Sequence, residues 1–82
     1  MAELLQSYAE TLRDARGVEY TVHAYGELRE DGNWEGWLEF HPAAGEVRRT
    51  NRETTQPNFE ALRYWASGLE PVYFDGAFAR AS

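Results

Sequence analysis

Cysteine, lysine and isoleucine are all absent from this 82-residue sequence. Without cysteine the chain has neither disulfide bonds nor thiolate zinc sites, and nothing indicates an oxidising compartment. All eight basic side chains are arginines. Because the codons of lysine and isoleucine are rich in A and T, their absence indicates a GC-rich bacterial genome rather than a particular function.

Positive charge and long apolar runs are also scarce. Fourteen acidic side chains and eight arginines give a net charge of −6, which disfavours nucleic-acid binding because that binding needs clustered cations. No apolar run approaches the ~18 residues of a membrane span, and no secretory leader is recognisable. We therefore expect a cytoplasmic protein that binds neither nucleic acid nor membranes.

The length predicts a single small domain over residues 1–82. A chain of this size buries only about 60–65% of its unfolded surface, so its stability is expected to be modest or to be supplemented by a partner. Three tryptophans, five tyrosines and four phenylalanines are many for this length. Large aromatic side chains bury much area per residue, and most of them are expected in the core.

The stretch 18–41 is predicted to form an antiparallel hairpin. Apolar and polar residues alternate along 18–28 and again along 34–41, at the period of half-buried strands. We expect a three-residue loop at 31–33, because a two-residue loop would pair Leu28 with Glu35 and reverse the faces of one strand. Either Gly32 or Asn33 would supply the positive φ angle.

One face of this hairpin is predicted to form the floor of the core. Its side chains would be Val18, Tyr20, Val22, Ala24, Leu28, Trp34, Leu38 and Phe40. Gly26 and Gly36 would leave a shallow depression on the same face, into which Trp65 or Tyr8 could press.

Residues 2–16 are predicted to form an amphipathic helix. Apolar side chains recur at helical spacing, at Leu5, Tyr8, Leu12 and Ala15. Gly17 follows at the position of a left-handed helix cap. A second helix is expected from Pro57 to Gly68, with Pro71 preventing its continuation. Trp65 of this helix is expected to be buried against the sheet.

A short third strand is predicted over residues 46–50, after a four-residue turn. This register places Val47 opposite Phe40 on the core face and Arg48 opposite Glu39 on the other face, as an ion pair. Arg49 would then point to the core side at the sheet edge, with its guanidinium in water.

These elements predict an α+β two-layer sandwich in one domain. Its expected order is an N-terminal helix, a three-stranded antiparallel meander, a second helix and a short C-terminal strand or turn after Pro71. Both helices would cover the same face of the sheet.

The uncovered face of the hairpin carries the main candidate for an interface. Trp37 is expected to project there into solvent, among carboxylates, and exposed aromatics ringed by charge are typical of interaction surfaces. The interface candidates are Tyr25, Arg29, Trp37, Glu39 and Arg48.

Two further sets of side chains are weaker candidates. His23 and His41 would face each other near Glu39, but a third fixed metal ligand is not evident, so no metal site is assigned. The only basic cluster is Arg48, Arg49 and Arg52. It precedes a polar loop and a helix N-terminus, where anions are often bound.

No motif for nucleophilic or acid–base catalysis is present, so we expect neither an enzyme nor a cofactor. The sequence therefore favours a protein–protein interaction or accessory module, either a homo-oligomer or a subunit of a complex. The alternative is a small anion- or ligand-binding domain that uses the segment Arg48–Asn58.

Overall fold

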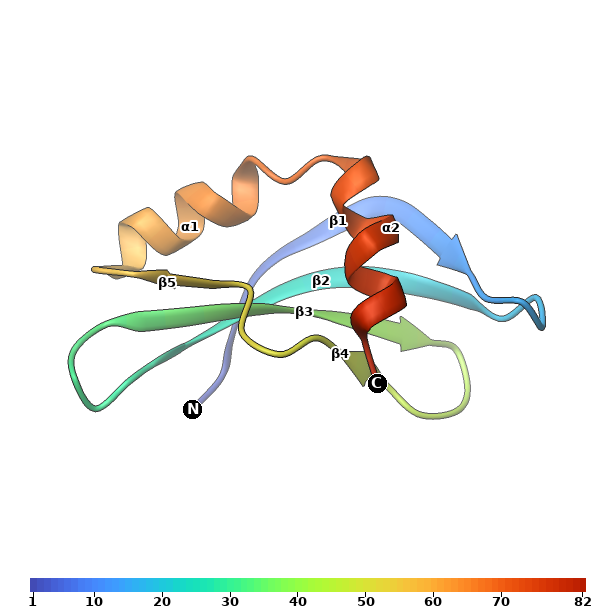
Figure 1. Cartoon of the computed structure of the whole chain (residues 1–82), viewed down its shortest axis with the longest axis horizontal. Helices are drawn as coiled ribbons and strands as arrows, with labels where there is room; N and C mark the ends of the chain where they lie inside the picture. The colour runs from blue at the N-terminus through green and yellow to red at the C-terminus, as the bar shows by residue number, and fades with distance from the viewer.

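The computed structural model describes all 82 residues and has an α+β fold in which strands come first and helices last (Figure 1). The strands are β1 (Glu3–Arg13), β2 (Glu19–Leu28), β3 (Trp34–Pro42), β4 (Arg48–Arg49) and β5 (Thr54–Gln56). The helices are α1 (Phe59–Ser67) and α2 (Pro71–Arg80). Neither is long and apolar enough to cross a membrane.

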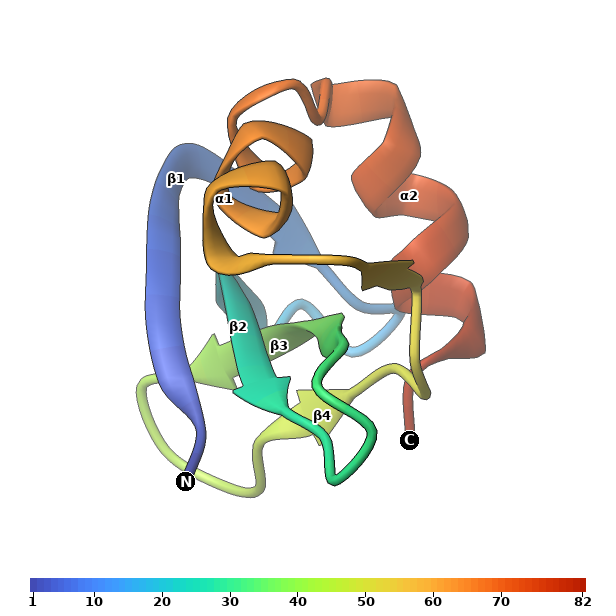
Figure 2. The same ribbon diagram turned by 90° about the vertical axis from the view of Figure 1, so that its left-hand side faces the viewer.

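The strands form one five-stranded antiparallel sheet in the order β1-β2-β3, with both β4 and β5 on the far edge of β3. Figure 2 shows α1 and α2 together on one side of this sheet. The two-layer arrangement expected from the sequence is therefore present, but the element order is different.

The predicted N-terminal helix is wrong, because residues 3–13 form strand β1. Two irregularities interrupt its pairing with β2, one between Leu4 and Gln6 and one between Ser7 and Thr11. Each places extra residues of β1 opposite β2. As a result the inward side chains are Leu5, Tyr8 and Leu12, at intervals of three and four that imitate a helix.

The hairpin is confirmed, but its loop is longer than predicted. Leu28 pairs with Trp34, so residues 29–33 connect the strands. Two backbone hydrogen bonds close this loop: the Arg29 N–H donates to the Asn33 carbonyl (2.7 Å) and the Gly32 N–H to the Arg29 carbonyl (3.0 Å). Gly32 has φ +88°. A shift of two residues leaves every side chain on its predicted face, because side chains alternate with a period of two along a strand.

Most of the predicted floor of the core is correct. Tyr20, Val22, Ala24, Leu38 and Phe40 are buried. Leu28 is the exception, because 56% of it is exposed near the end of the hairpin. Val18 and Trp34 are only partly buried.

The third strand is also displaced by one residue. Arg48 pairs with Phe40 and Arg49 with Glu39, so the predicted faces of these two arginines are reversed. Beyond β4, β5 resumes the pairing with β3, at Thr54 opposite Gly36. Residues 48–56 thus follow the edge of β3 with one interruption.

The predicted C-terminal strand or turn is instead the helix α2. Pro71 lies at its start, where proline is favoured. The side chains of Phe74, Ala77, Phe78 and Ala81 recur at helical spacing and pack into the core. Aromatic, β-branched and glycine residues lower the helix propensity of this segment, so packing rather than propensity maintains the helix.

Helix α1 packs over the two glycines of the hairpin, as the sequence suggested. Gly26 and Gly36 face each other across β2 and β3, and the side chains of Leu62 and Trp65 press on Gly36. Trp65 is partly rather than fully buried. The Tyr8 hydroxyl donates a 2.6 Å hydrogen bond to the Ala66 carbonyl, which links α1 to β1.

We expect Gly36→Ala to destabilise the protein by about 1–3 kcal/mol, because the new methyl group overpacks the contact between sheet and helix. A Cβ atom at Gly36 would lie 2.9 Å from Leu62 Cδ1 and 2.9 Å from Trp65 Cζ3. Urea denaturation followed by circular dichroism measures the effect.

The same substitution at Gly76 is the matched control and should have the opposite sign. Gly76 is exposed within α2, and its added Cβ would meet only Arg80, at 3.6 Å. Alanine should therefore stabilise that helix by about 0.5–1 kcal/mol. Equal stability of Gly36→Ala and the wild type would contradict the packing of α1 on β3.

Candidate functional site

The sheet face opposite the two helices is called here the outer face. Antiparallel sheets often leave one face in contact with solvent, and neither helix covers this one (Figure 2). Six side chains of β2, β3 and β4 gather on it: His23, Tyr25, Trp37, Glu39, His41 and Arg49. We call this group the outer-face cluster.

Trp37 lies on the outer face, as predicted, but the expectation of a solvent-exposed indole is wrong. Only 2% of the residue is exposed. The Arg49 guanidinium lies 4.3 Å from the centre of the indole. Tyr25, its cross-strand partner, has a nearly parallel ring at 6.4 Å. Neighbouring side chains thus cover the indole without a second layer of structure.

Glu39 connects the aromatic side chains of the cluster. One carboxylate oxygen accepts a 2.9 Å hydrogen bond from Trp37 Nε1. The other lies 2.9 Å from His41 Nε2. Only 17% of the Glu39 side chain is exposed, so both oxygens are engaged in a partly desolvated position, where such bonds are stronger.

His23 and His41 pack edge to face, with ring centres 4.7 Å apart. His23 Nε2 lies 2.9 Å from the Thr21 hydroxyl, which donates its proton to the His41 carbonyl. That hydroxyl must therefore accept from Nε2–H, and the His23 Nδ1 accepts from Ser7, at 2.8 Å. No group of three metal-ligating side chains suited to a metal ion occurs in the structure.

Burial lowers the pKa of His23 below its usual value, the neighbouring His41 lowers it further, and Glu39 opposes this change. The folded protein therefore binds the proton more weakly than the unfolded chain. Stability should be at its full value above the unfolded-state pKa of about 6.5 and should decrease as the pH falls towards the lower folded-state pKa.

Urea denaturation between about pH 7 and pH 5 tests this dependence. We expect His23→Gln to show a shallower loss of stability on acidification than the wild type, because its side chain does not titrate. Asp14 and Glu53 also have lowered pKa values, but as carboxylates they act at more acidic pH. Parallel profiles for the two proteins would contradict the prediction.

The basic cluster is divided between the two faces of the sheet. Arg48 lies on the core side, 4.3 Å from the centre of the Phe78 ring, and donates a 3.4 Å hydrogen bond to the Ala81 carbonyl. Arg49 lies on the outer face, and Arg52 is exposed in the interruption between β4 and β5. The fold does not bring Arg48 and Arg49 together around one anion.

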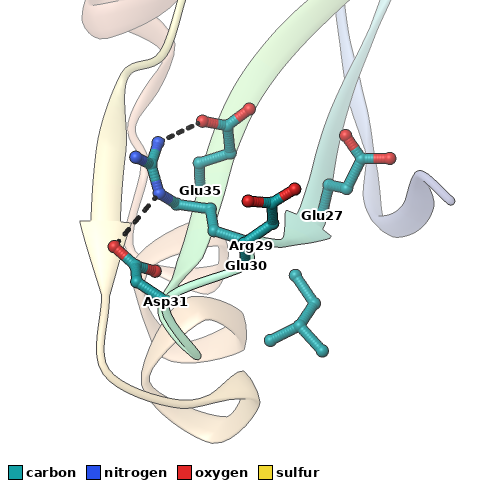
Figure 3. Close-up of a pocket in the computed structure, with 6 residues that line it drawn as sticks. Glu27, Arg29, Glu30, Asp31 and Glu35 are labelled. Atoms are coloured by element: carbon teal, nitrogen blue, oxygen red, sulfur yellow. Dashed lines mark hydrogen bonds and ion pairs between the residues drawn. The ribbon is translucent and has the colours of Figure 1, made fainter.

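Arg29 lies away from the outer-face cluster, in the loop of the hairpin. It lines a hollow together with Leu28 and four carboxylate side chains, Glu27, Glu30, Asp31 and Glu35 (Figure 3). Its guanidinium is 2.9 Å from Glu35 and 3.6 Å from Asp31. Strand pairing places Glu27 opposite Glu35, and Arg29 reaches Glu35 from the loop as an ion pair.

A polar group that the sequence did not reveal links the segment before β5 to α2. Glu53 accepts hydrogen bonds from the Tyr73 hydroxyl and, at 2.6 Å, from Arg80. Burial alone would raise the pKa of Glu53, but these bonds together lower it. Only the helical form of residues 71–80 brings Tyr73 and Arg80 to one side, and the sequence prediction lacked that helix.

The interface candidates are therefore only partly assembled in one place. Tyr25, Trp37 and Glu39 meet on the outer face, but Arg49 stands there instead of Arg48. Comparison of the chain with models of protein families, with curated proteins and with solved structures finds no match.

Proposed function

We propose that this protein is a protein–protein interaction module that associates through the outer face of its sheet. The observation that carries the proposal is the covered indole of Trp37 under Arg49, on a face that neither helix occupies. Aromatic and arginine side chains are the residue types most enriched where proteins bind one another.

The partly exposed rings of Tyr25 and His41 extend this surface. They are nearly parallel, with centres 6.2 Å apart. Leu4, directly opposite Tyr25 in β1, is 55% exposed. The surface thus combines apolar, aromatic and charged groups, which suits recognition of a protein better than recognition of a small molecule.

The alternative, anion binding by the segment Arg48–Asn58, has less support. Its two adjacent arginines lie on opposite faces, and Glu53 within the same segment carries a negative charge bound to Arg80. The first residues of α1 are capped by Asn58, which accepts from the Ala61 N–H at 2.8 Å.

Site-specific photo-crosslinking in bacterial cells that express the protein tests the proposal. The photoreactive side chain replaces Leu4 on the outer face or Tyr64, which is 81% exposed on α1. We expect discrete crosslinked products from position 4 and none from position 64. Products of twice the chain mass identify self-association, and heavier or unequal products identify another subunit.

Equal labelling from both positions would contradict association through the outer face. Circular dichroism of both variants verifies that the fold is retained. Because each replaced side chain is largely exposed, neither substitution should alter stability by more than about 0.5 kcal/mol.

A further inference from the structure

We propose that Arg49 binds a carboxylate of the protein partner, so that the outer face recognises an acidic side chain. This inference rests on the proposed function and names the chemistry of its partner. It follows from three features of Arg49: a fixed backbone, a guanidinium that lies over the Trp37 indole, and the lack of an acceptor within its own chain.

The backbone of Arg49 is held from both sides. On one side β4 pairs with β3, with Arg49 opposite Glu39. On the other side the N–H and carbonyl of Arg49 exchange 3.1 Å hydrogen bonds with Ser82. The position from which the side chain leaves the sheet is therefore set by the fold.

The guanidinium also lies over an aromatic ring that is itself held in place. It lies 4.3 Å from the centre of the Trp37 indole, and the indole is itself held by its hydrogen bond to Glu39. An arginine that rests on an aromatic ring keeps its N–H groups available at the edge of the plane. Less side-chain entropy is then lost when an acceptor binds.

The guanidinium of Arg49 has no ion pair or hydrogen bond within the chain. Four other arginines, Arg13, Arg16, Arg29 and Arg80, each pair with a carboxylate. The cross-strand neighbour of Arg49 would be the natural partner, but both oxygens of Glu39 are engaged by Trp37 and His41. The Arg49 guanidinium therefore has no acceptor, although the chain carries a net charge of −6.

The arrangement fits a carboxylate better than a phosphate or a nucleic acid. A guanidinium edge binds a carboxylate through two parallel N–H···O bonds. The net charge of −6 repels a phosphate group more strongly than a carboxylate, because phosphate carries more negative charge. It repels a polyanion most of all. Only one guanidinium is present on this part of the outer face, because Arg48 points to the other side.

The probes for the test are N-acetylglutamate methylamide, its glutamine counterpart and inorganic phosphate, each added at constant ionic strength. Nuclear magnetic resonance follows the Nε–H signals of Arg49 and Arg63 and the indole N–H of Trp37. Arg63 is the matched control, because it is exposed, unpaired and not stacked on a ring.

We expect the glutamate probe to bind at Arg49 about fivefold more tightly than at Arg63, the upper range for an exposed ion pair. The glutamine probe should leave both signals unchanged. In Arg49→Lys the glutamate probe should no longer shift the indole N–H signal of Trp37, because an ammonium group has no flat edge, whereas in Arg63→Lys the shifts of Trp37 and of the Arg49 Nε–H should persist.

Equal shifts at Arg49 and Arg63, or tighter binding of phosphate than of the glutamate probe, would overturn the carboxylate assignment. The proposed function fails separately, through equal crosslinking from positions 4 and 64. Crosslinking from position 4 together with no preference of the probe for Arg49 would overturn this inference alone.

Discussion

Trp37→Ala should destabilise the protein by about 3–5 kcal/mol, the range for removing a large buried aromatic side chain. The substitution removes an indole that is 2% exposed, its hydrogen bond to Glu39 and the surface on which Arg49 rests. A domain of this length has a total stability of only a few to about 12 kcal/mol. Urea denaturation followed by far-ultraviolet circular dichroism measures the loss.

Two variants delimit the cause. Trp37→Phe keeps an aromatic ring under Arg49 but loses the N–H donor. It should therefore be less stable than the wild type but more stable than Trp37→Ala. Tyr64→Ala removes an aromatic side chain that is 81% exposed and should change stability by less than about 0.5 kcal/mol. Were Trp37→Ala as stable as Tyr64→Ala, the indole would be a dispensable surface group.

Phe74→Ala should cost a similar amount, about 3–5 kcal/mol, because it leaves a cavity between α2 and the sheet. Phe74 is 1% exposed, and its ring lies 4.7 Å from that of Tyr8 in β1. The contact joins the first strand to the last helix, the two elements that the sequence assigned to other structures. Thermal and urea unfolding both measure the effect.

Val72→Ala is the control in the same helix, because 77% of Val72 is exposed. It should be neutral or slightly stabilising, since the side chain is exposed and alanine favours a helix more than valine does. Small effects of both substitutions would indicate that residues 71–80 do not pack on the sheet.

The candidate site was predictable in its residue types but not in its contacts. Alternation placed Tyr25, Trp37 and Glu39 on one face, and that assignment is correct. The cover over Trp37 depended on the loop before β4, which has one residue more than expected and so exchanged Arg48 for Arg49. Because side chains alternate along a strand, one residue decides which arginine reaches the indole.

The sequence alone determined what depends on local period and on side-chain size. The alternation in 18–28 and 34–41 set the faces of β2 and β3, and a loop longer by two residues did not alter them. The apolar stripe of α1 and the small residues Gly26 and Gly36 likewise determined where that helix rests.

Only the tertiary structure decided the first and last elements. The irregular pairing of β1 with β2 changed the spacing of its inward side chains from that of a strand to that of a helix. Residues 71–80 are helical because Phe74 and Ala77 are buried against the sheet, despite weak local propensity. Both outcomes depend on the free energy of contacts between segments far apart in the chain, which no local pattern contains.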